Sequence, residues 1–435
     1  MSLNKADVLQ FVAENDVKFI RLAFCDIFGV QKNIAIMATE IEKAFSHGIP
    51  FDASAVSGFM NVEDSDLLLF PDPDTLSILP WRPSQGRVVR LFCNIKYPDG
   101  RPFEGDGRTI LANAVKRAGD MGFTLTIGTK CEFYLFERDE TGHPTKVPHD
   151  YAGYLDITPR DKGENIRRQI CLTLEEMGVK PENSHHEHGP GQNEIDFASG
   201  DPLTAADNFI TFKSVVTTLA NGSGLFASFM PKPLKDKSGS GLHINLSLLK
   251  NGINLLDGSE ISGDCAHFIA GILERISDLT VFLNPLTNSY ARFGEFEAPK
   301  YITWSHQNSS HLIKIPRIPG ANAAFTIRSP DAMANPYFVF ALLINAGLDG
   351  ILKQTKLPTP CRVNLFTATA REAKHYKTLP ENLNKAIKTC EKSEFIKSTL
   401  PQKIIAHFLN IKKKEWDAYN EAADKNALED ALYFC

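Results

Sequence analysis

Residues 185–197 read His-His-Glu-His-Gly-Pro-Gly-Gln-Asn-Glu-Ile-Asp-Phe, and the fold is most readily deduced by working outward from this segment. Alternation after the glycines predicts a β-strand in which Gln192, Glu194 and Asp196 share one face. The histidines lack the i, i+4 spacing of a helical zinc site, and no cysteine lies close to them in the sequence. Two glutamates seven positions apart, Glu187 and Glu194, suit a hard cation such as Mg²⁺ or Mn²⁺ better.

Two further segments place polar groups in apolar strands. In Leu242-His-Ile-Asn-Leu-Ser-Leu, the side chains of His243, Asn245 and Ser247 share one face. Ser238-Gly-Ser-Gly leads into this strand, and its glycines would let the backbone approach a ligand closely, although an ordinary half-solvated strand gives the same pattern. In Gly128-Thr-Lys-Cys-Glu-Phe-Tyr-Leu-Phe, burying Glu132 costs several kcal/mol unless it is paired or metal-bound. A salt bridge to an arginine is the alternative to a metal.

Two arginines lie in similar settings, Arg292 in Asn-Ser-Tyr-Ala-Arg-Phe and Arg328 in Phe-Thr-Ile-Arg-Ser-Pro-Asp. A planar guanidinium matches the geometry of a carboxylate or phosphate, so both are candidates for anion recognition. Surface arginines are commoner, and neither position alone distinguishes the two cases.

Composition favours a folded protein that acts on small molecules. The chain has 435 residues, which favours two domains, and a net charge of -5, which favours neither nucleic acid nor an anionic membrane as a partner. Its N-terminus lacks the apolar stretch of a signal peptide, and no segment is apolar for long enough to span a bilayer. The eight cysteines are scattered without a CxxC pair, which is typical of reduced thiols. We therefore expect a cytoplasmic protein.

Hydrophobic patterning and turn signals predict the main elements. Strands are expected at Phe19–Phe24 and Val88–Ile95, with a loop-rich stretch from Phe51 to Gly86. Helices are expected in four regions: Asp106 to Gly122, Pro202 to Ala220 with Thr204 as N-cap, Ser329 to Ile351, and much of the chain after Leu379. The lysine run that starts at Lys412 is interpreted as a solvated helix face.

Taken together and in this order, these segments resemble glutamine synthetase, specifically its bacterial type I group. The likeness covers nearly the whole chain. Other collinear segments that carry it are Arg21-Leu-Ala-Phe-Cys-Asp-Ile-Phe-Gly-Val-Gln-Lys-Asn, Phe51-Asp-Ala-Ser-Ala-Val-Ser-Gly-Phe, Ser65-Asp-Leu-Leu-Leu-Phe-Pro-Asp-Pro-Asp-Thr, Phe229-Met-Pro-Lys-Pro, Gly239-Ser-Gly-Leu-His, Asn335-Pro-Tyr and Gly347-Leu-Asp-Gly-Ile. The resemblance implies an α+β fold, with a β-grasp N-terminal domain at residues 1–103 and a larger glutamine synthetase-type catalytic domain at residues 104–435.

The resemblance also implies an assembly. Members of the family form homododecamers of two stacked hexameric rings, with each active site between neighbouring subunits. Asp52 and Asp66 match the aspartates that a neighbouring subunit contributes, and Asp52 would help to bind and deprotonate ammonium.

In this family ATP phosphorylates the γ-carboxylate of glutamate, and an amine then displaces phosphate. Such phosphoryl transfer needs divalent cations to neutralise the oxygens of ATP, so the resemblance implies Mg²⁺ or Mn²⁺ as cofactor and ATP as co-substrate. By motif position, Glu132, Glu187 and Glu194 match the carboxylates of the first metal site. His243 matches the histidine of the second.

Other motif positions imply substrate-binding and catalytic roles. Arg292 and Arg328 match the arginines that hold the substrate carboxylate and the transferred phosphate. Gly239 falls in the glutamate-binding turn. Glu297 matches the flap glutamate that closes the site and helps to deprotonate the attacking amine.

The chain departs from the family pattern mainly on the nucleotide and second-metal side. Three motifs differ: Lys130-Cys-Glu replaces Glu-x-Glu, Thr326-Ile-Arg replaces Glu-x-Arg, and Asn308-Ser-Ser replaces Asn-Arg-Ser. Three further positions also differ. Lys314 replaces an arginine, Asn245 replaces a histidine that is common in the family, and the aromatic residue expected shortly after Glu194 is replaced around Ala198-Ser199. Two of three ligands of the second metal are therefore missing. We expect Lys130, Ser247 and Lys314 to contribute to nucleotide binding.

These departures leave two hypotheses. In the first, the Lys130 ammonium compensates for a lost ion, and the protein is an ATP-dependent ligase that forms a γ-glutamyl amide. Retained Asp52 and Glu297 then favour ammonia or a primary amine, although the amine need not be ammonia and the carboxylate need not be glutamate. In the second, phosphorylation has been abandoned, and an inactive paralogue binds glutamate or glutamine as a sensor or partner subunit.

Overall fold

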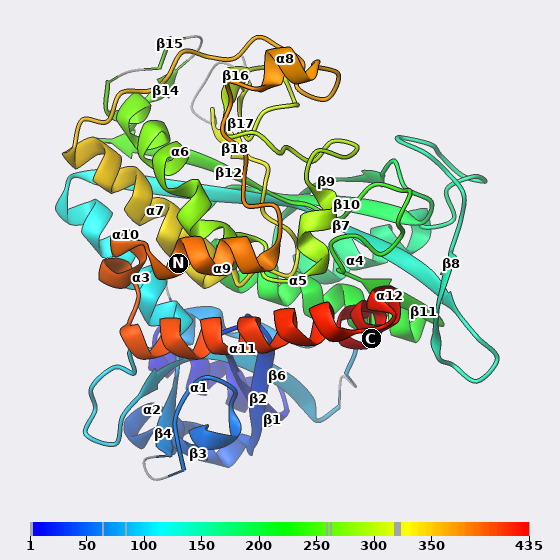
Figure 1. Cartoon of the computed structure of the whole chain (residues 1–435). Coiled ribbons are helices and arrows are strands. Elements are labelled where there is room, and N and C mark those ends of the chain that lie inside the picture. The colour runs from blue at the N-terminus through cyan, green and yellow to red at the C-terminus, as the bar shows by residue number, and fades with distance from the viewer. Residues whose placement is uncertain are drawn as a thin grey trace.

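The computed structural model describes residues 3–62, 65–82, 85–257, 260–261, 263–316 and 323–434. Figure 1 shows the N-terminal part, in blue, below the remainder of the chain, with helix α11 (Gln402–Glu421) crossing between them. Phe408 on α11 stacks on Phe28 of the N-terminal part at 5.4 Å and on Phe282 above it at 4.6 Å between ring centroids. This aromatic stack fixes the two parts against each other.

The N-terminal part is a six-stranded sheet in the order β2-β1-β6-β4-β3, with β5 paired to β6. Strand β1 runs parallel to β6 and antiparallel to β2. Helix α1 (Lys5–Glu14) begins at a capping box between Asn4 and Asp7. The other elements are α2 (Ile41–His47), β1 (Val17–Cys25), β2 (Gln31–Met37), β3 (Ile49–Asp52), β4 (Asp66–Pro71), β5 (Ser77–Ile78) and β6 (Arg87–Lys96).

A second, ten-stranded sheet organises the rest of the chain, in the order β16-β17-β18-β12-β7-β10-β9. The 16-residue strand β7 (Phe123–Arg138) lies at its centre and also pairs with β8 and β11. The remaining strands are β8 (Pro144–Pro148), β9 (Pro181–His186), β10 (Gln192–Phe197), β11 (Leu225–Ser228), β12 (Leu242–Lys250), β13 (Ile253–Asn254), β16 (Trp304–His306), β17 (Ile313–Ile315) and β18 (Phe325–Ile327), and a separate small ribbon pairs β14 (Leu256–Asp257) with β15 (Glu260–Ile261).

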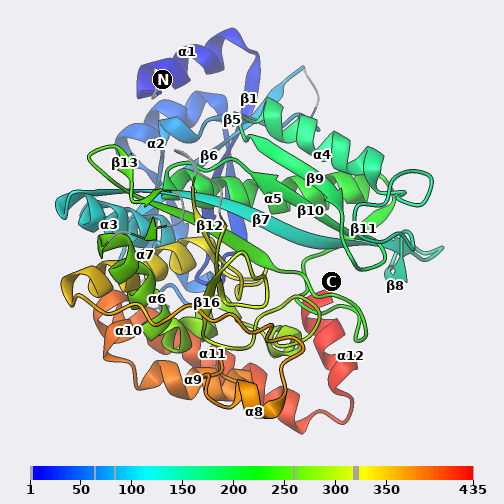
Figure 2. The same cartoon turned by 90° about the horizontal axis from the view of Figure 1, so that it is seen from above.

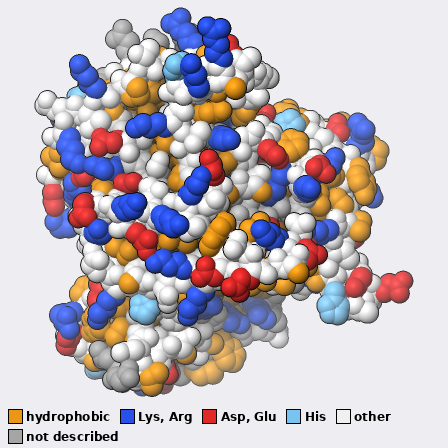
Figure 3. Space-filling model, viewed as in Figure 1, with side chains coloured by type: hydrophobic (Ala, Val, Ile, Leu, Met, Phe, Trp, Pro, Cys, Tyr) orange, Lys and Arg blue, Asp and Glu red, His pale blue; other side chains and the backbone are white. Residues whose placement is uncertain are grey.

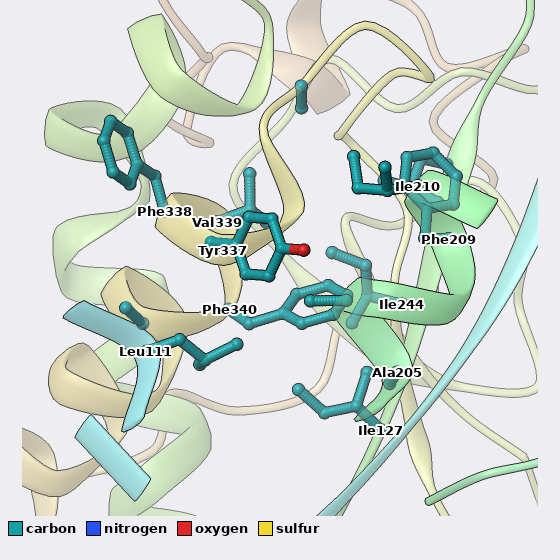
Figure 4. Packing of buried hydrophobic residues seen from close by; sticks show 14 of the residues in the cluster. Leu111, Ile127, Ala205, Phe209, Ile210, Ile244, Tyr337, Phe338, Val339 and Phe340 are labelled. Carbon is teal, nitrogen blue, oxygen red and sulfur yellow. The ribbon is translucent and has the colours of Figure 1, made fainter. Parts of the chain in front are cut away.

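Helices with buried apolar side chains cover the hydrophobic face of this sheet. In Figure 2, α4 (Glu164–Glu176) and α5 (Pro202–Gly222) lie to one side of β7, and α6 (Gly263–Leu283) and α7 (Pro336–Leu352) lie to the other. Figure 4 shows side chains of α7 and α5 meeting Ile127 of β7 and Ile244 of β12. Helices α6 and α7 approach closely at glycine, because a Cβ on Gly350 would lie 2.2 Å from the carbonyl oxygen of His267.

Arg108 joins the two parts of the chain. It lies at the start of α3 (Gly107–Asp120), and its side chain is 4% exposed. The guanidinium donates to both carboxylate oxygens of Asp207 on α5, at 3.1 and 2.9 Å. It also reaches Asp72 and Asn94 of the N-terminal part, each at 2.9 Å. The hydroxyl of Tyr337, visible in Figure 4, donates to the same Asp207 at 2.6 Å.

Most predicted elements are confirmed, but two helix starts and one loop are not. Helix α5 begins at Asp201, whose side chain accepts from the amides of Leu203 and Thr204, so Thr204 is not its N-cap. Residues 329–331 are not helical, and Asp331 forms a bridge with Gly241. Helix α7 begins instead at the Asn335 cap, with Pro336 in its first turn. The stretch predicted to be loop-rich contains β4, since Leu67 and Leu69 are buried against the neighbouring strands.

The C-terminal region is helical as predicted, in α8 (Ala370–Ala373), α9 (Leu383–Glu391), α10 (Glu394–Thr399), α11 and α12 (Lys425–Glu429). The lysine run is solvated at Lys413 and Lys414, as predicted, but the prediction is wrong for Lys412. Its side chain is 3% exposed, pairs with Glu415 at 2.9 Å and lies over the rings of Phe28 and Phe408. The aliphatic stem of a lysine can cover apolar surface, which explains its place at the junction.

Lys, Arg, Asp and Glu side chains are interspersed over the face shown in Figure 3, as the small net charge suggests. None of the helices in the described residues is both long enough and apolar enough to cross a bilayer. The cysteines between Cys25 and Cys390 that the structure describes are free thiols. The domain boundary after Phe103 stays a prediction.

Candidate active site

A cavity of about 990 Å³ opens over the polar face of the large sheet. Its floor follows from strand register, because directly paired residues point to the same face. Lys130 of β7 pairs with Asp196 of β10 and with His243 of β12. One pleat further along, Glu132 pairs with Glu194. In the other direction, Asn245 pairs with Thr326. The sheet thus brings together four strands, β7, β10, β12 and β18, that are separate in the sequence.

Glu132 lies within this floor without an arginine partner. Its Oε2 accepts from the amide of Gly241 at 2.9 Å and from the side-chain amide of Gln192 at 3.2 Å. No arginine in the part of the chain that the structure describes lies within ion-pair distance of this carboxylate. The alternative of an arginine salt bridge is therefore not realised.

The buried carboxylates raise one another's pKa. Burial, followed by the charge of Glu187, raises the pKa of Glu132 to about 7. Burial, followed by the charge of Glu132, raises the pKa of Glu194 to about 10. Such a cluster is destabilised when all of its members are ionised, and a cation placed among them would relieve the repulsion.

Possible ligand atoms fall into two overlapping sets. One contains His185, Glu187 and Glu194, and the other contains Glu132, Glu194 and His243, with the atoms of each set within 4.8 Å of one another. The oxygen-rich, largely buried donors fit Mg²⁺ or Mn²⁺, and the imidazoles suit Mn²⁺ in particular. Glu132, Glu187 and Glu194 line one cavity, and Glu194 belongs to both ligand sets. His185 is an additional possible ligand that was not predicted from the sequence.

Lys130 takes a carboxylate partner within the floor. Its ammonium donates a hydrogen bond to Asp196 and lies 3.9 Å from Glu194 Oε1. Burial lowers the pKa of Lys130, but the charge and hydrogen bond of Asp196, with Glu194, outweigh this and raise it overall. Lys130 is therefore a fixed cation beside the metal-binding candidates.

Two arginines also line the cavity. Arg292 is 3% exposed and donates to the carbonyls of Ser329 and Pro330, each at 3.2 Å. Arg328 donates to the carbonyl of Glu297 at 3.2 Å. The Nε of each arginine is buried and has no hydrogen-bond partner among the described residues. These groups are preorganised for an anion.

Gly239 lies where a side chain would not fit. A Cβ there would lie 2.5 Å from the carbonyl oxygen of Pro231 and 2.6 Å from Arg292 Cγ. The backbone of this turn lines the cavity beside Arg292, and only glycine allows that approach.

Glu297 lies at the mouth of the cavity. Its carboxylate is 61% exposed and lies between His188 Nε2, at 3.6 Å, and Arg328 Nη2, at 3.7 Å. The ring of His188 stacks on Tyr154 at 4.7 Å and 15°. Tyr154 was not predicted as a site residue, and His188 was considered only as a possible zinc ligand; both lie outside the regular strands.

The nucleotide-side candidates occupy different positions. Lys314 lines the cavity and its ammonium donates to Ser309 Oγ at 3.0 Å. Burial, followed by the charge of Arg328, lowers the pKa of Lys314. Ser247 instead is 4% exposed, lies outside the lining formed by the described residues, and donates to the carbonyl of Ala323 at 2.8 Å. Its hydroxyl supports the Ala323 loop, which differs from the predicted direct contact.

Asp52 and Asp66 face each other across strands β3 and β4, and both are exposed. Asp52 accepts from the hydroxyl and the amide of Ser54 at 2.6 and 2.9 Å, and these hydrogen bonds lower its pKa. Within the described residues, neither aspartate lines the cavity of its own chain.

Comparisons with known proteins agree on one family. The family model for the glutamine synthetase β-grasp domain matches residues 16–98, and the model for the glutamine synthetase catalytic domain matches residues 104–431. Glutamine synthetase from Clostridium saccharobutylicum is 45% identical over 435 aligned positions, which cover 98% of each chain. Glutamine synthetase from Methanosarcina mazei is 44% identical and covers 95% of this chain and 94% of its own.

Solved structures give the same fold. The structure described as "GmaS/ADP complex-Conformation 1" superposes with a TM-score of 0.88 at 28% identity, covering 98% of this chain and 99% of its own. A Plasmodium falciparum glutamine synthetase superposes with a TM-score of 0.87, covering 100% of this chain and 99% of its own; at 24% identity it supports the fold alone. The predicted architecture, a β-grasp domain followed by a larger α+β catalytic domain, is confirmed.

Proposed function

The chain belongs to the glutamine synthetase family, and we propose that it is an ATP-dependent ligase that joins glutamate, or a similar carboxylate, to ammonia or a small amine. One observation carries this proposal. The acidic cluster around Glu132 and Glu194 and the side chains of Arg292 and Arg328 line the same cavity. A cation site and an anion site side by side are what phosphoryl transfer to a carboxylate requires.

The proposed reaction has two steps. A γ-carboxylate oxygen attacks the terminal phosphorus of ATP, the bond to the bridging oxygen breaks, and ADP leaves with that electron pair. The amine nitrogen then attacks the acyl carbon, loses a proton, and expels phosphate with the carbon–oxygen electron pair. The products are the amide, ADP, phosphate and one proton.

The residues of this chain divide the work by position. Either of two ligand sets would hold Mg²⁺ or Mn²⁺. One set is His185, Glu187 and Glu194, and the other is Glu132, Glu194 and His243. When bound, the divalent ion would neutralise phosphate oxygens during transfer.

Two arginines suit the anionic groups of the substrates. Arg292, beside the Gly239 turn, would bind the substrate carboxylate. Arg328, which lies between Glu297 and the acidic floor, would stabilise the charge of the transferred phosphoryl group.

Glu297 suits the proton-transfer step. Its exposed carboxylate at the cavity mouth is placed to accept a proton from an entering amine.

Asp52 and Asp66 are exposed and do not line the cavity of their own chain. They would complete the site of a neighbouring subunit in a homododecamer. We keep the expectation of a cytoplasmic location.

A second candidate is a protein that binds glutamate or glutamine without phosphorylating it. The observation that favours it is the state of the phosphate side, where Ser309 and Thr326 have short neutral side chains and the Lys130 ammonium is engaged by carboxylates. Arg292 and Gly239 would serve substrate binding in either case. The two candidates differ in whether ATP is consumed.

The test is phosphate release from ATP by the full-length protein with Mg²⁺ or Mn²⁺ and glutamate, across ammonia, hydroxylamine and a panel of small primary amines. We expect release that requires glutamate and one of the amines. Glu297→Gln should slow this release most, because it removes the base. Glu140→Gln, a matched change at an exposed turn, should not alter it.

Two outcomes would reject the ligase. One is the absence of release with every amine from protein that still binds glutamate in a calorimeter, which would establish the second candidate. The other is release that is independent of glutamate, which would indicate a different acceptor.

A further inference from the structure

Lys130 divides the acidic floor of the cavity into two unequal halves. Strand register places it between Asp196 on one side and His243 on the other, all three side chains on the same face. Its ammonium lies toward the acidic side, where it contacts Asp196 and comes within 3.9 Å of Glu194. The carboxylates thus gather on one side of Lys130, and His243 stands on the other.

The surroundings of His243 are cationic. Arg328, Arg292, Lys130 and Lys314 line the same cavity as His243, and Arg292 Nη2 and His243 Nε2 lie 2.9 and 3.3 Å from the position that a Cβ on Gly241 would take. A divalent ion placed beside His243 would meet the same positive side chains. Thr326 and Asn245, which close this side of the floor, are neutral and hydrogen-bonded to each other at 2.7 Å.

Among the described residues, the floor of the cavity does not provide enough carboxylates for two ions. The two possible ligand sets share Glu194, so occupation of either set uses this side chain. Asp196 is not among the described residues that line the cavity: its Oδ2 binds Lys130 and accepts from Asn183, and its Oδ1 is buried without a described hydrogen-bond partner. A second ion would therefore keep only Glu132 and a neutral imidazole to itself, against several cations. Hard divalent cations usually bind several oxygen ligands.

We propose that the centre binds a single divalent cation, and that the Lys130 ammonium, held by Asp196 and Glu194, supplies fixed positive charge in place of a second ion. The inference deepens the proposed function, because it concerns the charge available to phosphate in the same cavity. Only the role assigned to the Lys130 charge, which is to interact with phosphate, rests on the proposed function. The number of bound ions is measured without nucleotide, glutamate or turnover.

The experiment is a Mn²⁺ titration of the full-length protein, followed by electron paramagnetic resonance and by calorimetry. We expect one Mn²⁺ per chain and no spin coupling between adjacent ions. The double variant Lys130→Glu/Thr326→Glu places carboxylates on both sides of His243 and removes the ammonium. It should bind two Mn²⁺ per chain and show the broadened signal of an adjacent pair.

Matched variants separate a specific effect from a general loss of charge. Lys314→Met removes a different cavity lysine and should leave the stoichiometry at one. Lys130→Met should also leave it at one, because no ligand is added, but should tighten the single site severalfold by removing a nearby positive charge. This variant keeps the test decisive if the double variant does not fold.

Three results would overturn the proposal. They are two Mn²⁺ per chain in the unmodified protein, unchanged affinity in Lys130→Met, and a folded double variant that still binds one ion. None of them would reject the ligase, which depends on phosphate release. Conversely, a protein that releases no phosphate but binds a single Mn²⁺ would leave this proposal standing and reject the ligase.

Discussion

Replacement of Arg108 by methionine should destabilise the protein more than any change at an exposed arginine. The Arg108 side chain is 4% exposed, and its guanidinium makes a bidentate pair with Asp207, whose side chain is 9% exposed. Its shortest contact with Asp207, at 2.9 Å, is worth about 6 kcal/mol at an effective dielectric constant of about 20, before desolvation is subtracted. Breaking such a buried pair costs ~3–5 kcal/mol, because the remaining charge is left without compensation. Of the donors to Asp207 described above, only the Tyr337 hydroxyl would remain.

The assay is urea unfolding of Arg108→Met, followed by tryptophan fluorescence and far-ultraviolet circular dichroism. The control is Arg101→Met, which removes an exposed pair with Asp99 and should leave the unfolding midpoint unchanged. Arg108→Met/Asp207→Asn should recover part of the loss, because it removes the unpaired charge and keeps an acceptor for Tyr337. A loss below about 1 kcal/mol in the single variant, or no recovery in the double variant, would refute the electrostatic reasoning.

Three further predictions concern the cavity. Added Mg²⁺ or Mn²⁺ should raise the Tm more at pH 8 than at pH 6, because burial and neighbouring carboxylates raise the pKa of Glu132 to about 7. The metal-free fold loses stability as pH rises toward and through this value, and the cation restores it; equal increments at both pH values would contradict this. Gly239→Ala should weaken glutamate binding at least tenfold by calorimetry, about 1.4 kcal/mol, since its Cβ would lie 2.6 Å from Arg292 Cγ and displace that side chain. Lys314→Met should weaken binding of an ATP analogue, whereas Ser247→Ala, whose hydroxyl is bonded to a backbone carbonyl, should not; the reverse order would restore the original prediction for Ser247.

Alternation along single strands was enough to identify much of the site. His243 and Asn245 share a face of β12, and Glu194 and Asp196 share a face of β10, as predicted. The period of a strand fixes which side chains share a face, whatever the strand packs against. Likewise, Glu132 was singled out because a carboxylate in an apolar strand needs a partner, and that requirement is local.

Predictions that depended on choosing between equivalent local signals were less successful. Asp201-Pro202 and Asn335-Pro336 are the caps that begin α5 and α7, yet Thr204 and the Ser-Pro-Asp at 329–331 carry similar signals. The choice at 329–331 was made by tertiary structure, because Asp331 pairs with Gly241 and cannot also begin a helix. Lys412 was misassigned for a related reason, since burial of its stem depends on Phe28, which is remote in the sequence.

The sequence by itself determined the fold family, the faces of the strands and the chemical character of the cavity, because these follow from local alternation and from collinear motifs. Only the tertiary structure decided which groups are partners. It paired Lys130 with Asp196, placed Glu194 in both candidate ligand sets, and directed the Ser247 hydroxyl to a backbone carbonyl. The physical reason is that charge interactions and hydrogen bonds act over a few ångströms, and strand register, not sequence distance, sets which side chains come that close.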